Sequence, residues 1–352
     1  AYTPYQAEAS QGTLQAIYEY QSMICRLTGM DISNASLYDG GTALFEAMMM
    51  AVRISGKRRA VISEAVSPIF RTMIRCYCAN LEVELAEVAA GVDDSAMAKL
   101  LNSVDDNTAC VIVQYPNFFG RIEDWSVFTK ALQDKKVISI ASSYPTALAL
   151  ITPPGELGFD IVTGEGQSLG IPLSFGGPYL GFMAVREKYM RKMPGRVVGR
   201  AKDHDGRDGF VLTLQAREQH IKRENATSNI CSNESLCALR SLIYLSALGK
   251  DGFVEVANLC AANAVYTRNE LLKIKHVEPV GGEAFFNEFV IKLPMDASLA
   301  AGHMIDRGFA VGFPLGRYYP DRKNELLIAV TEKRTPEEIK SMVAALEAVL
   351  WN

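Results

Sequence analysis

The first 185 residues alternate between short, nearly continuous apolar runs and longer segments with helical periodicity. The apolar runs include 59–63 (RAVIS), 109–115 (ACVIVQY) and 179–185 (YLGFMAV), with helix-like segments between successive runs. Strands buried on both faces have unbroken apolar sequences, and parallel strands need a crossover connection, usually a helix. The alternation therefore predicts an α/β domain with a mostly parallel sheet and helices on both faces.

The rest of the chain combines a polar stretch with a smaller unit. Residues 190–229 are rich in Gly, Arg, Lys and Asp, which predicts a long surface excursion with a functional or interface role. Helices are expected near 234–248 and 252–274, and the last helix should begin at Thr335-Pro336-Glu337-Glu338. We expect three parts: an N-terminal arm and helix over 1–30, a large domain over 31–250, and a small C-terminal α+β domain over 251–352.

The composition excludes several classes of protein. Of 352 residues, 49% are hydrophobic and 22% charged, and the net charge is −4, so neither nucleic acid nor an anionic membrane is an expected partner. No apolar run reaches the length of about 18 residues that spans a membrane. The seven cysteines lack regular spacing and the four histidines are scattered, which indicates a reducing compartment and no metal site.

Residues 160–178 (DIVTGEGQSLGIPLSFGGP) form a glycine-rich stretch after a predicted strand. Such loops often hold phosphate through backbone N–H groups. This stretch, however, contains no lysine, arginine, histidine or cysteine. It therefore permits close approach of the backbone but offers little reactive chemistry.

Three other segments carry groups that suit a ligand. The helix start Asp39-Gly-Gly-Thr42 either offers N–H groups to an anion or is a structural N-cap. Residues 116–120 (PNFFG) end a predicted strand, where ligands of α/β sheets bind, although a tight turn with two packed aromatics explains them somewhat better. Residues 217–232 offer donors enough to hold an anionic group, or form a solvated loop. The spacing indicates no catalytic triad and no pair of catalytic carboxylates.

Four long blocks of this sequence resemble the P-protein of the glycine cleavage system, the glycine decarboxylase. Within that family the chain is similar to the N-terminal-type (α) subunit found where the enzyme is split into two chains. The resemblance implies that the family's α subunit carries further residues before Ala1. The blocks are 1–47, 111–124, 155–182 and 217–239.

The resemblance implies a fold type I pyridoxal-phosphate (PLP) architecture without the catalytic groups. The Schiff-base lysine of the catalytic β-type chain falls at Ser168, and Gln167 replaces the histidine before it. The aspartate that pairs with the pyridine nitrogen falls at about Tyr144. Serine cannot form an imine, and tyrosine supplies no carboxylate. The family therefore implies a non-catalytic subunit of glycine dehydrogenase (decarboxylating), inactive without a β subunit that binds PLP.

The resemblance also implies partners and site residues. The expected assembly is a cytoplasmic α2β2 heterotetramer that acts on glycine and passes the aminomethyl group to the lipoyl arm of H-protein. Tyr2 and Tyr5 are expected to line the glycine and lipoyl entrance. The turn Thr227-Ser228-Asn229 is expected to face the partner's PLP phosphate. His220 and Arg223 are further candidates for the partner's site.

Two alternatives remain at this point. The chain could be a self-sufficient PLP enzyme that uses another lysine, such as Lys188 or Lys192, which follow the stretch 179–185. It could also be a non-enzymatic scaffold on a degenerate PLP fold. Trapping of an imine in the isolated chain would favour the first alternative, and absence of any lysine-bearing partner would favour the second.

Overall fold

The computed structural model describes residues 3–89 and 95–351, which divide into two compact units. The first unit contains residues 3–89, Met97–Tyr115 and Asp124–Lys250. The second contains Pro116–Glu123 and residues 251–351, together with residues 95–96. The division after Lys250 falls where the small domain is expected to start. Residues 116–123, which the sequence-based limits assign to the large domain, pack in the second unit instead.

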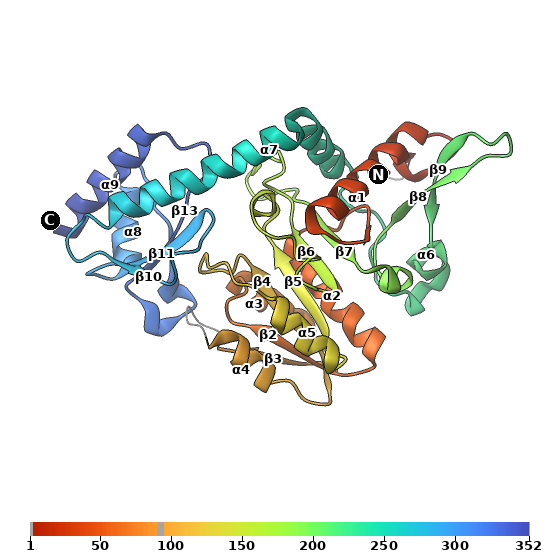
Figure 1. The fold of residues 1–352 in the computed structure, drawn as a ribbon, viewed down its shortest axis with the longest axis horizontal. Coiled ribbons are helices and arrows are strands. Elements are labelled where there is room, and N and C mark those ends of the chain that lie inside the picture. The colour runs from red at the N-terminus through yellow and green to blue at the C-terminus, as the bar shows by residue number, and fades with distance from the viewer. Residues whose placement is uncertain (1–2, 90–94, 352) are drawn as a thin grey trace. The chain divides into compact units, whose positions relative to one another are not determined.

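The first unit is built on a seven-stranded sheet of order β1-β7-β6-β5-β4-β2-β3 (Figure 1). Strands β2 to β6 are parallel to one another, whereas β7 is antiparallel to both β6 and β1. This confirms the mostly parallel sheet. Its strands are β1 (Ile32–Ser33), β2 (Arg59–Ser63), β3 (Glu84–Val88), β4 (Thr108–Tyr115), β5 (Ile138–Ser143), β6 (Ile161–Glu165) and β7 (Gly181–Val185).

Helices cover both faces of this sheet. On one face, apolar side chains of α2, such as Leu44 and Met48, share a core cluster with Ile112 and Ile140 of the central strands. On the other face, α5 packs along β5, and its Phe128 is buried together with the preceding Trp125. Among the described residues no helix combines the length and the apolar character needed to cross a membrane. The helices of this unit are α1 (Gln11–Thr28), α2 (Gly40–Ser55), α3 (Pro68–Cys78), α4 (Ala96–Asn102), α5 (Ser126–Asp134), α6 (Gln219–Lys222) and the start of α7 (Ser235–Leu271).

The polar stretch 190–229 contains a β-hairpin that the sequence analysis missed. Strands β8 (Val197–Lys202) and β9 (Asp208–Thr213) are antiparallel, and α1 lies beside them (Figure 1). Gln21 of α1 donates to Val198 O and accepts from Val198 N, both at 2.9 Å, and Gln11 bonds Phe210 in the same way. Most residues of the hairpin are exposed, so the strands lack the apolar alternation by which a strand is recognised.

The second unit has a four-stranded antiparallel sheet of order β10-β11-β13-β12. The later part of α7 belongs to this unit, and Gly249, which is non-helical, separates the two helical parts that the sequence predicts. The predicted start of the last helix is confirmed, since Thr335 and Glu338 form a capping box with backbone-to-side-chain bonds of 3.0 and 3.2 Å. The remaining elements are β10 (Glu278–Val280), β11 (Glu288–Lys292), α8 (Ala297–Ile305), β12 (Phe313–Pro314), β13 (Glu325–Ala329) and α9 (Pro336–Trp351).

The segment 116–120 is a tight turn with packed aromatics. Asn117 Oδ1 accepts from the backbone N–H of Phe119 and of Arg121, each at 3.0 Å. The Phe119 ring contacts both the Tyr319 ring, at 5.2 Å between centroids, and the Arg322 guanidinium, at 4.3 Å. The turn interpretation of this segment is therefore confirmed.

Glu288 on β11 gives the second unit a pH-dependent stability. Burial raises its pKa from the ordinary 4.5 to about 7. Between these values the unfolded chain releases a proton that the folded chain keeps, so stability is lost as the pH rises from 4.5 to 7. We expect Glu288→Gln to reduce the change of the melting temperature with pH over this range. The same variant should stabilise the protein at pH 8 by about 1 to 3 kcal/mol. The control is Glu337→Gln on the exposed side of α9, and an equal effect of both variants would contradict the assignment.

Candidate functional site

Ser168 and Tyr144 lie beyond the carboxyl ends of the neighbouring parallel strands β6 and β5, where ligands of open α/β sheets bind. The Ser168 hydroxyl accepts a hydrogen bond of 2.9 Å from the buried Thr146 hydroxyl. Tyr144 continues from β5, and its N–H lies 3.3 Å from Tyr115 O. The position expected for a cofactor lysine therefore holds a neutral hydroxyl pair that offers no amine.

The anion position at the start of α2 is occupied by a carboxylate of the chain itself. Gly40 N–H donates to Glu165 Oε2 at 2.9 Å, and Glu165 Oε1 accepts from the N–H of Gln167 and of Leu180 at 2.9 and 3.0 Å. Asp39 and Thr42 complete a capping box. Glu165 is close enough that a Cβ on Gly40 would lie 2.8 Å from the Glu165 Cβ. The N-cap interpretation of Asp39-Gly-Gly-Thr42 is confirmed.

The groups that enclose Glu165 determine the pKa of its carboxyl. Burial raises the pKa of Glu165, the three N–H donors oppose that rise, and the nearby Asp39 adds to it. The helix start and the turn amides provide the positive end of local dipoles that an anion needs. Glu165 therefore occupies the anion position that the sequence offers at this helix start.

Glycines in residues 160–178 permit close packing rather than phosphate contact. A Cβ on Gly164 would overlap Ser143 O and the Phe182 ring. Gly170, at φ 82°, faces Tyr244, whose Cβ would lie 2.7 Å from a Cβ on Gly170. A side chain at either position would force the neighbouring strand or helix apart.

We expect removal of the Glu165 carboxylate to destabilise the first unit. Glu165→Ala leaves three N–H groups without their acceptor, which should lower the free energy of unfolding by about 2 to 3 kcal/mol. Glu165→Gln keeps one oxygen for Gln167 and Leu180, so its cost should be smaller. Urea unfolding followed by the fluorescence of the buried Trp125 measures both, and an Ala variant as stable as the parent would contradict the internal-anion interpretation.

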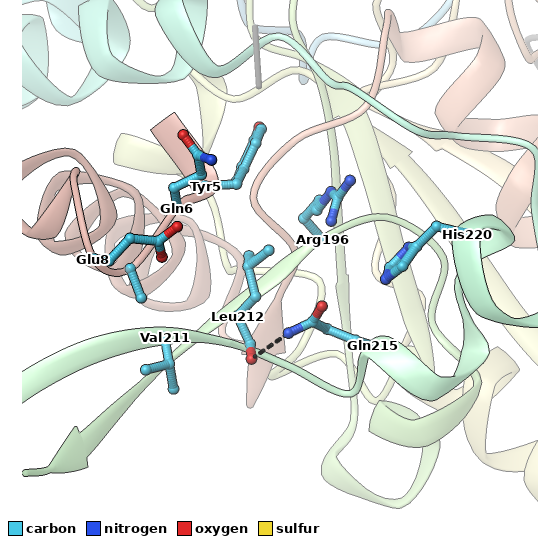
Figure 2. Close-up of a pocket in the computed structure, with 9 residues that line it drawn as sticks. Tyr5, Gln6, Glu8, Arg196, Val211, Leu212, Gln215 and His220 are labelled. Carbon is cyan, nitrogen blue, oxygen red and sulfur yellow. Dashed lines mark hydrogen bonds between the residues drawn. The ribbon is translucent and has the colours of Figure 1, made fainter. Parts of the chain in front are cut away.

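A cavity of about 370 Å³ brings together two of the residues predicted to face a partner, Tyr5 and His220. Figure 2 shows Tyr5, Gln6 and Glu8 on one side of it, His220 on the other, and Arg196 between them. The cavity wall also includes apolar side chains of β9. The cavity therefore combines polar donors with an apolar wall.

A buried ion pair includes Arg196, which lines this cavity. Arg196 and Glu218 are both less than a tenth exposed and pair at 3.0 Å, and Arg196 Nε donates to Cys231 O at 3.1 Å. The Arg196 guanidinium lies over the Tyr5 ring at 5.1 Å. Glu218 Oε1 has no hydrogen-bond partner among the described residues. Arg196 is thus the main compensation for the buried Glu218 charge.

Tyr5 is fixed within the chain, and Tyr2 lies outside the described residues. The Tyr5 hydroxyl bonds Asn233 Oδ1, and burial raises the pKa of Tyr5 to about 12. Tyr5 therefore stays a neutral donor at physiological pH. Its ring reaches the cavity while its hydroxyl is engaged elsewhere.

The polar cluster 217–232 splits into inward-facing and outward-facing groups. Ser228 Oγ donates to Glu46 Oε1 at 2.8 Å, and Thr227 Oγ1 donates to Arg217 O at 3.3 Å. Asn229 and Arg223 are exposed. The solvated-loop interpretation therefore fits only part of the cluster, and the exposed side chains are the ones free to meet another molecule.

Four charged residues of the site, Glu46, Glu165, Arg196 and Glu218, were missed by the sequence analysis. Glu46 is buried, its Oε2 has no hydrogen-bond partner among the described residues, and burial raises its pKa. A glutamate inside the apolar run LFEAMMMA is a signal that could have identified it. Glu165 likewise stands alone between glycines in an otherwise uncharged loop.

The fold defines the structural class of protein to which the chain belongs. The chain has the fold type I architecture of PLP-dependent enzymes, with the site at the carboxyl edge of the large sheet. Glutamate decarboxylase from Lactobacillus brevis shares this fold at 14% identity, with a TM-score of 0.72 over 96% of this chain and 80% of that one.

More specific comparisons give the family. The family model of the glycine cleavage system P-protein matches residues 1–346. The chain therefore belongs to the P-protein family. A protein of Geotalea daltonii, named probable glycine dehydrogenase (decarboxylating) subunit 1, is 52% identical over 99% of this chain and 79% of its own length, and its Moorella thermoacetica counterpart is 50% identical with the same coverage. A crystal structure of an inhibitor-bound glycine decarboxylase (P-protein) is 41% identical, with a TM-score of 0.94 over 99% of this chain and 79% of that one.

Proposed function

We propose that this chain is the non-catalytic α subunit of glycine dehydrogenase (decarboxylating), EC 1.4.4.2, and that a partner β subunit carries PLP. Together the subunits would decarboxylate glycine and pass the aminomethyl group to the lipoyl arm of H-protein. The observation that carries the proposal is the occupied anion position, where Gly40 N–H donates to Glu165 in a chain whose relatives are named as one subunit of this enzyme.

The residues of this chain do not fit the cofactor. When bound, PLP supplies the electron sink for loss of a carboxylate as CO₂. A fold type I site offers it an amine, a carboxylate for the pyridine nitrogen and donors for the phosphate. The matching positions here hold Ser168, Tyr144 and an N–H already bound to Glu165. No step through the cofactor is therefore assigned to this chain.

The contribution of the chain is to bind and position groups at the partner's site. Exposed amide and guanidinium groups, such as those of Asn229 and Arg223, can donate to a phosphate or carboxylate. The apolar wall of the cavity beside Tyr5 and His220 suits the alkyl part of a lipoyl arm. We assign the turn Thr227-Ser228-Asn229 to the side of the partner's phosphate, with the exposed Asn229 side chain as its free donor. Tyr2 and Tyr5 are assigned to the entrance for glycine and lipoyl, and His220 and Arg223 are further candidates for the partner's site.

We infer an α2β2 heterotetramer that works in the cytoplasm. The name subunit 1 borne by the relatives supports a partner chain. The seven cysteines are free thiols, which suits a reducing compartment.

The alternative of a self-sufficient enzyme finds no support at its candidate lysines. Lys188 pairs with Asp160 at 3.0 Å, and although burial lowers the pKa of Lys188, the bond to Asp160 raises it overall, which keeps the amine protonated. A protonated amine is not a nucleophile. Lys192 is exposed at the end of the short helix Glu187–Lys192.

The test is reductive trapping of the cofactor. We expect no stoichiometric adduct at a single lysine of the isolated chain after incubation with PLP and borohydride, and a stoichiometric adduct confined to the partner when both chains are present. Intact-mass spectrometry reads both outcomes, and the partner alone is the control. A PLP adduct mapped to a specific lysine of this chain, such as Lys188, would overturn the proposal.

A further inference from the structure

The tip of the glycine-rich loop presents apolar side chains to solvent. Residues 172–176 are all exposed, with Leu173 at 66% and Phe175 fully exposed. A phenylalanine in this setting gains nothing from the fold of its own chain, because burial of apolar area is what stabilises such a side chain. Exposed apolar groups of this size typically mark a contact with another molecule.

The loop is held in a conformation that costs free energy. Ser174 and Phe175 have φ of 45° and 57°, in the left-handed region that residues other than glycine rarely adopt, and Gly176 and Gly177 follow at 122° and 129°. The N–H groups of Gly176 and Gly177 donate to Leu173 O at 3.0 and 3.2 Å. Such strain persists where surrounding bonds impose it, commonly at functional positions.

The base of the loop is anchored to the rest of the first unit. Gly166 N–H donates to Leu180 O, and Gln167 Nε2 donates to Ile171 O, both at 2.6 Å. Arg240 of α7 donates to Gly170 O, also at 2.6 Å. These hydrogen bonds hold the base of the loop to the first unit, so the exposed tip projects from an anchored segment.

The same anchor connects the loop to an exposed helix face. Leu236 and Ile243, four residues before and three after Arg240, share its face of α7 and are 76% and 60% exposed. We call Leu173, Phe175, Leu236 and Ile243 the loop–helix surface.

We propose that the loop–helix surface is a docking surface for the PLP-bearing partner subunit, with Phe175 as its central anchor. This inference rests on the proposed function and adds the place of contact. The loop begins next to Ser168, at the carboxyl edge of the sheet. A chain bound to the loop would therefore lie close to the position where a catalytic chain carries its cofactor lysine.

The chemistry of the loop favours a permanent partner over a transient carrier. Residues 166–180 contain no charged side chain. Permanent subunit interfaces are the more apolar ones, whereas transient encounters rely more on polar and charged groups. A second subunit fits this surface better than a mobile carrier protein does.

The test compares binding of the partner by two charged variants and a matched control. Phe175→Asp and Leu173→Asp should each raise the Kd for the PLP-bearing subunit about tenfold or more, because a desolvated anchor is replaced by a charge. Ile305→Asp on α8 of the second unit replaces a side chain of the same 66% exposure as Leu173 and should leave the Kd unchanged. Sedimentation velocity gives the Kd, and thermal melting verifies that each variant is folded.

The outcomes separate the two proposals. If the parent chain binds the partner and both charged variants bind it equally well, the docking surface is wrong while the proposed function stands. If the charged variants lose only self-association, the surface pairs two copies of this chain, and the inference is overturned. If the parent chain does not bind the partner at all, the proposed function itself fails.

Discussion

Arg196→Met should lower the free energy of unfolding of the first unit by about 3 to 5 kcal/mol, because the buried Glu218 carboxylate loses its partner at 3.0 Å and keeps only the longer contact of 3.6 Å with His220 Nδ1. The substitution also removes the guanidinium from the Tyr5 ring and the donor from Cys231 O. Urea unfolding followed by Trp125 fluorescence measures the loss. The cavity between Tyr5 and His220 should become less ordered in the same variant.

Two further variants show whether the buried charge is the cause. Glu218→Gln combined with Arg196→Met should cost less than the sum of the single changes, because no charge then stays behind. Arg200→Met removes an arginine from the exposed pair with Asp208, on the adjoining strand β8, and should have a much smaller effect. Equal losses for Arg196→Met and Arg200→Met would contradict the importance of burial.

Gly164→Val should destabilise the first unit by at least about 3 kcal/mol. Its side chain would be built against Ser143 O and the Phe182 ring, and a clash of a Cβ with backbone cannot be relieved by a change of rotamer. The strands β5, β6 and β7 would have to separate at the edge where the site lies. The same urea titration measures this change.

The matched control for Gly164→Val is a glycine in open space. A Cβ on Gly12 in α1 meets no atom within 4 Å, so Gly12→Ala should leave stability unchanged or raise it by up to about 1 kcal/mol. A Gly164→Val variant that unfolds at the same urea concentration as the parent would show that the loop glycines are not needed for close packing.

The central part of the fold could be predicted because its strands follow a simple rule. Strands such as β4 and β5 are buried on both faces, so their sequences consist of apolar and small residues without a charged side chain, which a pattern detects. The hairpin β8–β9 escaped detection because it is largely exposed and is held by glutamine side chains of α1 far away in the sequence. The place of 116–123 in the second unit depends on tertiary contacts such as those of Phe119, which no local pattern encodes.

Residue type and residue pairing differ in what the sequence tells about the site. The resemblance to the P-protein family points to Ser168 and Tyr144 through residue type alone, and their correspondence to the lysine and the aspartate stays a prediction. The Glu165 carboxylate accepts from Gly40 at the start of α2, and these two residues are 125 positions apart in the sequence. Arg196 and Glu218 could likewise be recognised as a buried pair only in the folded chain.

The most direct test of the central claim is exchange of label between bicarbonate and the carboxyl group of glycine. The chain supplied with PLP but without its partner should give no exchange, and addition of the PLP-bearing subunit should produce it. Replacing Ser168 with Ala in this chain should leave the exchange of the mixture unchanged, because the hydroxyl takes part in no reaction step. Exchange by the isolated chain, or none in the mixture, would contradict the account.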